Sequence, residues 1–198
     1  MKPGRATFPP GGEWDSRLTG VACADLQPVK TLHENPWFTV RDRGGYYTTE
    51  FKQRQVIVLP VIDDSAIIMV RVPRPVLGDS TLELPAGAAE DGEDPVAAIA
   101  REFAEETGIA IADRGRFTPM PPLAPSPNRM PNLIYVFRLD LTRAEFDGRG
   151  PHDDEVESVE CVPLREAARL IASGGIYVAV PVAIIGTYLL DKLNLEAK

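Results

Sequence analysis

The chain has 198 residues, a formal net charge of −8 and two cysteines, and 44% of its residues are hydrophobic. This apolar content excludes a chain that is disordered throughout, and two cysteines are too few for a disulfide-based scaffold. The 29 acidic residues outnumber the 21 basic ones and no basic run occurs, which disfavours a nucleic-acid-binding module. Proline is unusual, because its 19 copies are about twice the ordinary usage.

The N-terminal fifty residues predict a loose arm followed by short strands. Residues 1–20 are rich in glycine, proline and charge and lack the apolar stretch of a signal peptide, so we expect a cytoplasmic protein. The expected strands are Val29–Leu32, Phe38–Arg43 and Tyr46–Phe51. Gly44 and Gly45 suit a hairpin turn between the last two.

Apolar, β-branched runs in the middle of the chain predict the strands of a sheet. Gln55–Val61 and Ala66–Val72 indicate a buried hairpin. Further strands are expected at Thr81–Leu84, Leu133–Leu139 and Val156–Val162. Residues 118–131 hold six prolines and are expected to form a loop. Such a loop either contacts a substrate or serves as a stiff surface connection.

Three helices are expected, and the clearest is Pro95–Thr107. Asp94 can cap it, Pro95 suits its first turn and Gly108 ends it. The other two are Leu164–Ser173 and Val182–Leu193. The apolar run over 176–190 is too short to span a membrane. Strands with interspersed helices indicate a layered α/β or α+β domain.

The first of these helices carries three carboxylates on one face. Its expected buried stripe consists of Val96, Ile99, Ala100, Phe103 and Thr107. Glu102, Glu105 and Glu106 lie on another face, within an arc of about 100°. One interpretation is a solvated acidic face. The other is a divalent-cation site, because hard cations bind several carboxylate oxygens and relieve their repulsion.

The spacing around this helix distinguishes the two interpretations. Gly87 is followed by five residues and Glu93, and seven further residues lead to REFAEETGI at 101–109. This pattern resembles the Nudix box, GX5EX7REUXEEXGU with U a bulky apolar residue, and every defined position is filled. A chance match is expected on the order of once in a million. The chain therefore resembles the Nudix hydrolases.

This resemblance implies a fold and an activity. The fold is a mixed β-sheet sandwiched between helices, here with an N-terminal antiparallel extension over residues 1–52 and a hydrolase domain over 53–198. The activity is hydrolysis of a nucleoside diphosphate linked to another moiety, with Mg²⁺ or Mn²⁺ as cofactor. A bound metal neutralises the pyrophosphate, lowers the pKa of water and orients the phosphorus.

The resemblance also assigns roles within the box. It implies metal ligation by Glu102, Glu105, Glu106 and the backbone carbonyl of Ala86, with Glu105 and Glu106 also catalytic. Structural roles in the motif fall to Gly87, Glu93, Arg101 and Gly108. Arg101 is expected to hold Glu93 or to orient the carboxylates.

The flanking residues resemble those of ADP-ribose pyrophosphatases and nucleotide-sugar hydrolases. LELPAG at 82–87 matches their lead-in, and Pro125 stands 16 residues after Ile109. Pro125-Ser126-Pro127 is similar to their Pro-Ser-Pro-Gly turn, although Asn128 replaces the glycine. Asparagine also tolerates the left-handed backbone conformation.

Substrate contacts are implied for Arg74, Glu83, Arg129 and Trp37. Arginine suits phosphate because its fork binds two oxygens at once, although a plain surface role for Arg74 is the alternative. Trp37 belongs to an aromatic group with Phe38, Tyr46 and Tyr47. In related dimers an aromatic from exchanged N-terminal strands stacks on the nucleobase. Packing within this chain is the alternative.

The catalytic base of several such enzymes comes from an acidic loop outside the box. Here that segment is 152–157, HDDEVE. Glu155 fits best, with Asp153 and Glu157 as alternatives and a solvated acidic turn as the structural explanation.

We therefore expect a Nudix pyrophosphatase that cleaves ADP-ribose or a related nucleoside diphosphate sugar into a nucleoside monophosphate and a sugar phosphate. GDP-mannose is an alternative substrate, and a non-catalytic nucleotide-sugar sensor is the alternative of another class. The expected partners are a small-molecule substrate and a second copy in a homodimer, without nucleic acid or membrane.

Overall fold

The computed structural model describes residues 18, 23 and 25–196, the last three by their backbone only. The loose arm expected over residues 1–20 lies, except for Leu18, outside the described residues. The strands are β1 (Val29–Glu34), β2 (Phe38–Arg43), β3 (Tyr46–Phe51), β4 (Gln55–Ile62), β5 (Ala66–Arg74), β6 (Asp79–Glu83), β7 (Ala86–Ala88), β8 (Thr118–Leu123), β9 (Ile134–Leu141) and β10 (Ser158–Pro163). The helices are α2 (Pro95–Thr107), the short 3-10 turn η1 (Arg114–Arg116), α3 (Arg143–Asp147), α4 (Leu164–Ser173) and α5 (Ala179–Glu196).

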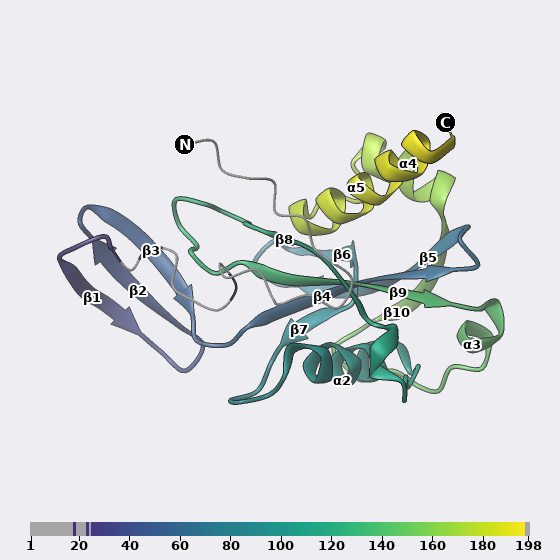
Figure 1. Cartoon of the computed structure of the whole chain (residues 1–198), viewed down its shortest axis with the longest axis horizontal. Coiled ribbons are helices and arrows are strands. Elements are labelled where there is room, and N and C mark those ends of the chain that lie inside the picture. Colours follow the sequence, from purple (N-terminus) through teal and green to yellow (C-terminus); the bar gives the residue numbers. More distant parts are fainter. Residues whose placement is uncertain (1–17, 19–22, 24, 197–198) are drawn as a thin grey trace.

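The strands form two sheets (Figure 1). β1, β2 and β3 make a three-stranded antiparallel sheet at one end of the molecule, which we call the N-terminal sheet. The central sheet has seven strands in the order β10-β5-β4-β9-β8, with β6 paired to β5 and β7 to β4. β4 and β9 run parallel while the other pairs are antiparallel. The central sheet is therefore mixed, as expected.

Helices cover both faces of the central sheet (Figure 1). Successive side chains of a strand point to opposite faces. Val56 and Val58 of β4 accordingly pack in one core with Phe103 of α2. Ile57 lies in the other core, with Ile185 of α5. The expected sheet between helices is confirmed, and α2 is held against one face by its apolar stripe.

The local sequence of α2 sets both of its ends. The Asp94 carboxylate accepts hydrogen bonds from the backbone N–H groups of Val96 and Ala97 at 2.9 and 3.3 Å, satisfying donors that the first turn leaves free. Gly108 ends the helix in the left-handed conformation, with φ 72°. Phe103 is fully buried, and its truncation to alanine is expected to cost about 3–5 kcal/mol.

Two sequence-based expectations need correction. The first half of the proline-rich segment 118–131 is not a loop but strand β8. β8 is the outer strand of its sheet, and its register with β9 shifts between Met120 and Leu123. Proline has no N–H to donate, and both an edge strand and an irregular register tolerate this lack. α5 begins at Ala179 instead of Val182, because Pro181 fits the first turn of a helix. β7, η1 and α3 were not anticipated, since segments of three to five residues carry little periodicity.

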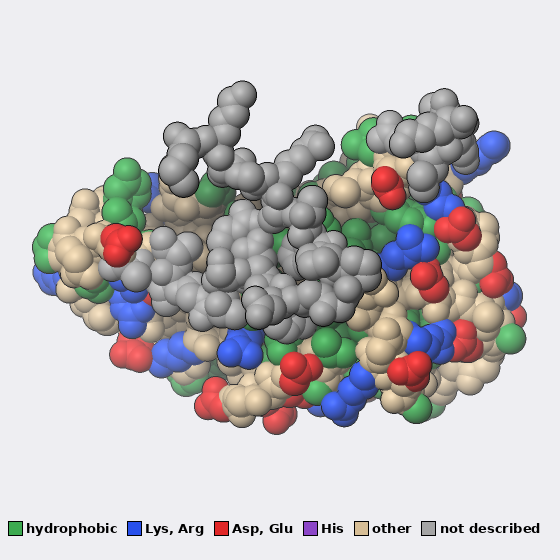
Figure 2. All heavy atoms as spheres, viewed as in Figure 1, with side chains coloured by type: hydrophobic (Ala, Val, Ile, Leu, Met, Phe, Trp, Pro, Cys, Tyr) green, Lys and Arg blue, Asp and Glu red, His purple; other side chains and the backbone are tan. Residues whose placement is uncertain are grey.

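The N-terminal sheet is far more exposed than the central one. Every residue of β1 is exposed. Figure 2 shows hydrophobic side chains on the surface over this sheet, and Trp37 and Tyr47 are 66% and 54% exposed. Phe38 is half-buried and meets the Phe51 ring edge-on, with the ring centres 6.5 Å apart. The packing interpretation of the aromatic group therefore holds for Phe38 and not for Trp37.

In the part of the chain that the structure describes, no helix has both the length and the apolar character needed to cross a bilayer. The apolar run ending at Leu190 forms most of α5, which packs on the central sheet.

Candidate active site

Glu106 is the most strongly perturbed carboxylate on α2. Its Oε2 accepts a hydrogen bond of 3.0 Å from the backbone N–H of Ala86, which joins the helix to β7. Desolvation is the main cause that raises the pKa of Glu106 to about 8. The hydrogen bond from Ala86 and the charge of Arg74 act in the opposite direction, whereas the charges of Glu102 and Asp153 add to the increase. Without a bound cation, the surroundings of Glu106 therefore disfavour its charged form.

Glu102 lies against a glycine that the box requires. A Cβ on Gly87 would lie 2.1 Å from the Glu102 carboxyl carbon, so no larger residue fits while Glu102 keeps this position. Oε1 of Glu102 accepts from the Ala88 N–H at 3.2 Å and from Arg101 Nη1 at 2.9 Å. Burial nevertheless raises the pKa of Glu102 against the effect of Arg101. The structure thus explains Gly87 by the space that a carboxylate needs.

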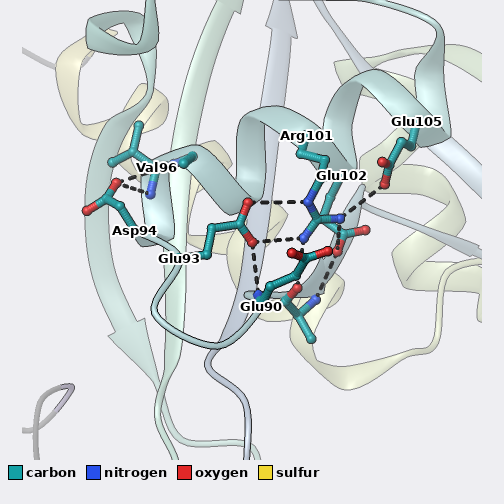
Figure 3. A network of polar contacts seen from close by, with 9 residues as sticks. Glu90, Glu93, Asp94, Val96, Arg101, Glu102 and Glu105 are labelled. Atoms are coloured by element: carbon teal, nitrogen blue, oxygen red, sulfur yellow. Dashed lines mark hydrogen bonds and ion pairs between the residues drawn. The ribbon is translucent and has the colours of Figure 1, made fainter.

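Arg101 connects the carboxylates with the loop before the helix (Figure 3). Its Nε and Nη2 donate to the two oxygens of Glu93 at 3.3 and 3.0 Å, and Nη2 also reaches the Ala88 carbonyl at 3.0 Å. Nη1 donates to Glu102 and, at 3.1 Å, to Glu105. Both expected functions of Arg101, holding Glu93 and orienting carboxylates, are present in this geometry.

Glu105 differs from its two neighbours, because its side chain is 48% exposed and paired with Arg101. Among the described residues, no three His, Cys, Asp or Glu side chains are already arranged to hold a metal ion. The donor set still suits a hard divalent cation, which prefers carboxylate oxygens. Such an ion would favour the charged forms of Glu102 and Glu106, and Glu105 could join them by leaving Arg101.

The acidic loop is attached to the C-terminal end of α2. Gly150 N donates to the Gly108 carbonyl and Asp153 N to the Glu105 carbonyl, both at 2.9 Å. A Cβ on Gly108 would lie 2.2 Å from the Gly150 carbonyl oxygen, so this contact also requires glycine. The loop therefore sits beside the carboxylates of the helix. The sequence contained no signal for this pairing, because 41 residues separate the two glycines.

The three acids of this loop have different surroundings. The charge of Asp153 acts on Glu106, and that of Glu155 acts on Arg74, so both lie near the site. Glu157 instead accepts a hydrogen bond of 2.7 Å from the Ser80 hydroxyl. Val156 between them is buried against Val70 and Val72 of β5 and anchors the loop on the sheet.

Arg74 ends β5 and belongs to the face that α2 covers. Residues two apart on a strand point to the same face, so Arg74 shares a face with Val70 and Val72. The acidic loop packs on this face through Val156. Its Nε and Nη2 donate to the two Glu83 oxygens at 2.7 and 3.0 Å. This pairing raises the pKa of Arg74, and the charges of Glu106 and Glu155 raise it further. The structure thus brings Arg74 and Glu83 to the same site as the box.

Arg129 and Trp37 belong to another part of the molecule. Arg129 Nη1 donates to the Tyr47 carbonyl at 3.4 Å, and the Arg129 carbonyl accepts from Thr49 N at 2.7 Å. Asn132, which the sequence did not single out, bonds both backbone groups of Phe51, at 3.0 and 3.2 Å. The loop after β8 is thereby tied to the N-terminal sheet. Among the described residues, neither Arg129 nor Trp37 forms a hydrogen bond or ion pair with the α2 carboxylates.

Comparison with known sequences agrees with the motif. A family model described as NUDIX domain matches residues 51–178. ADP-ribose pyrophosphatase of Bacillus subtilis (strain 168) is 33% identical over 122 residues, which are 62% of this chain and 64% of that protein. ADP-sugar pyrophosphatase of Mus musculus is 47% identical over 57 residues, 27% of this chain and 26% of that protein. The chain thus spans less than two thirds of the length of these curated relatives.

Comparison with solved structures supports the fold. A crystal structure described as an ADP compounds hydrolase superposes with a TM-score of 0.62 and covers 84% of this chain and 91% of that one. The sequence identity is 19%, so the likeness is one of architecture.

Proposed function

This chain belongs to the Nudix family, and on that premise we propose that it hydrolyses the pyrophosphate bond of ADP-ribose or a related nucleoside diphosphate sugar. The products are a nucleoside monophosphate and a sugar phosphate. The observation that carries the proposal is the pair of half-buried carboxylates, Glu102 and Glu106, with raised pKa values beside Arg74 and the acidic loop. The names of the Bacillus subtilis and mouse relatives support the substrate class.

We propose Mg²⁺ or Mn²⁺ as the cofactor. Glu102, Glu105 and Glu106, with the carbonyl of Ala86, would hold it, and the Ala86 N–H already bonds Glu106. When bound, the metal would neutralise the pyrophosphate and acidify water. Arg101 holds Glu102 and Glu93 in place, which keeps the ligands ordered before the ion binds.

The proposed reaction assigns further roles to residues around the helix. Arg74 binds a phosphate oxygen, and Glu155 accepts a proton from the attacking water. The water oxygen bonds to phosphorus as the bridging P–O bond breaks, and the leaving phosphate departs with the bridging oxygen. Asp153 is the alternative base, whereas the hydrogen bond from Ser80 disfavours Glu157.

Two residues outside this centre are proposed to contact the rest of the substrate. Arg129 carries a guanidinium on the loop that is tied to the N-terminal sheet, and Trp37 offers an exposed ring on that sheet. We also propose a division into residues 1–52 and 53–198, which is supported by the end of β3 at Phe51 and the start of β4 at Gln55. We further propose a cytoplasmic homodimer, supported by the exposed apolar side chains of the N-terminal sheet and by the free thiols of Cys23 and Cys161.

The test is an assay of the purified full chain with Mg²⁺ and a panel of diphosphates that includes ADP-ribose and GDP-mannose. Monophosphate release is expected to be fastest with ADP-ribose or a close analogue. Faster release from GDP-mannose would change the substrate. Tight binding of ADP-ribose without any release would contradict hydrolysis and favour a sensing domain.

A further inference from the structure

Glu83 is a buried carboxylate whose oxygens are both engaged. The residue is 8% exposed, and it lies at the end of β6 beside the lead-in to the box. Oε1 accepts from Arg74 Nε and from the Thr81 hydroxyl, and Oε2 accepts from Arg74 Nη2. Thr81 is itself buried. The carboxylate therefore has little capacity left to bind a ligand directly.

Arg74, in contrast to Glu83, keeps part of its guanidinium available for a ligand. One edge of the guanidinium is bound by Glu83 and the other edge is not. Its side chain is 47% exposed. Nε and Nη2 are held by Glu83, while within the described chain Nη1 makes no hydrogen bond. The charges of Glu106 and Glu155 act on this guanidinium, so it lies near both the helix carboxylates and the acidic loop.

The strand geometry explains how the pair forms. Thr81 and Glu83 share one face of β6, since Leu82 between them lies in the core against α5. Arg74 of the antiparallel neighbour β5 projects to the same face as Val70 and Val72. A two-point bond to a carboxylate fixes both the position and the plane of a guanidinium. A fixed guanidinium loses less freedom when it binds an anion.

We propose that Glu83 is a positioning residue that acts through Arg74. By binding one edge of the Arg74 guanidinium, Glu83 directs the other edge toward the diphosphate. This inference rests on the proposed function and changes the expected role of Glu83 from substrate contact to support of a substrate contact. Substitution of Glu83 should therefore weaken diphosphate binding and leave the chemical step nearly intact.

The test compares Glu83→Gln with Glu145→Gln in the full chain. Glu145 forms a similar two-point pair with Arg116 at 2.7 and 3.3 Å, on α3, and glutamine preserves its capping position. Glu83→Gln is expected to raise KM for ADP-ribose about tenfold with kcat within about threefold, which corresponds to one lost charged contact. Glu145→Gln is expected to leave both constants unchanged. A KM for Glu83→Gln within twofold of wild type would overturn the proposal.

A double-mutant cycle separates positioning from direct contact. If Glu83 acts through Arg74, then adding Glu83→Gln to Arg74→Ala should change KM by less than about twofold. Additive effects would show an independent role and overturn the proposal.

Two measurements keep the test independent of turnover. The Arg74 Nε–H signal in ¹H–¹⁵N spectra should exchange slowly in wild type and fast in Glu83→Gln, and unchanged exchange would contradict the pairing. Binding of inorganic pyrophosphate, measured by calorimetry, should weaken about tenfold in Glu83→Gln if Arg74 receives the anion. If wild type binds pyrophosphate without hydrolysing any diphosphate sugar, the proposed function fails while this comparison still decides the role of Glu83.

Discussion

Two clusters of arginine and glutamate in this molecule have opposite charge balances. In the N-terminal sheet, the single carboxylate of Glu50 is bound by Arg41, Arg43 and the Thr48 hydroxyl. These bonds hold the pKa of Glu50 at about 2 against the desolvation that would raise it. On α2, by contrast, the single guanidinium of Arg101 forms ion pairs with three glutamates. These are Glu93 in the loop before the helix, and Glu102 and Glu105 on the helix.

The difference shows which cluster is complete without a ligand. The charge of Glu50 is fully compensated within the protein, because Arg41, Arg43 and the Thr48 hydroxyl all bind its carboxylate. Glu102 and Glu106 have raised pKa values, mainly because burial disfavours their charged forms. A neighbouring carboxylate adds to the effect in each case, Glu105 for Glu102 and Glu102 for Glu106. The first cluster is a structural unit of the N-terminal sheet. The carboxylates of the second cluster keep perturbed pKa values, as expected for the cation-binding site that we propose there.

The largest expected effect comes from Glu106→Gln, which removes the most perturbed carboxylate. If its charge is needed for catalysis, turnover of ADP-ribose should fall about 10³-fold or more while circular dichroism and melting temperature stay near wild type. Steady-state kinetics on purified protein measure this. Turnover within tenfold of wild type would remove Glu106 from the proposed metal site.

A smaller loss is expected from Glu155→Gln, because general-base catalysis contributes about 10²-fold or more. The expected change is in kcat, since the residue acts on water and not on substrate binding. Asp153→Asn is the matched comparison, with a smaller loss if Glu155 is the base. The reverse order would transfer that role to Asp153, and a loss below tenfold for both would leave the loop without a base.

Glu50→Gln tests the other side of the comparison through stability. It leaves Arg43, whose side chain is 9% exposed, without its charged partner, so the free energy of unfolding should fall by about 2–3 kcal/mol. Urea denaturation followed by fluorescence measures this. A loss below about 0.5 kcal/mol would contradict the view of this cluster as a structural unit.

The pH dependence of the unfolding free energy should also differ between wild type and Glu50→Gln, and this effect is expected to be smaller. The folded pKa of Glu50 lies below its unfolded value of about 4.3, so its contribution is present above that value and is lost as pH falls toward about 2. Between pH 5 and 2.5, wild type should lose more unfolding free energy than Glu50→Gln. Parallel curves for the two proteins would contradict the lowered pKa.

The sequence was most informative where spacing alone constrains structure. Capping residues predicted the ends of α2, and helical periodicity predicted its buried stripe, of which only Val96 is half-buried. The Nudix fold that the box implied is confirmed. The box marked Gly87 and Gly108 as structural glycines, and the end of the helix gave one reason for Gly108. The reason for Gly87 and a second reason for Gly108 lie in contacts between distant segments, with the Glu102 carboxylate in one case and the Gly150 carbonyl in the other.

Residues beyond the box were harder to predict because tertiary contacts decide their roles. Glu83 is part of the lead-in motif, yet only the pairing of β5 with β6 brings it to Arg74. The prolines of β8 predicted a loop, and the position of that strand at the sheet edge overrides them. Asn132 had no distinguishing pattern, since its two bonds are to the backbone of Phe51.

The charge imbalance on α2 is tested most directly by titrating the full chain with Mn²⁺ or Mg²⁺ in a calorimeter, without substrate. The account predicts that wild type and Glu50→Gln bind the ion alike and that Glu106→Gln binds it at least tenfold more weakly. Equal affinity in Glu106→Gln and wild type would contradict the assignment of the α2 carboxylates as the metal site.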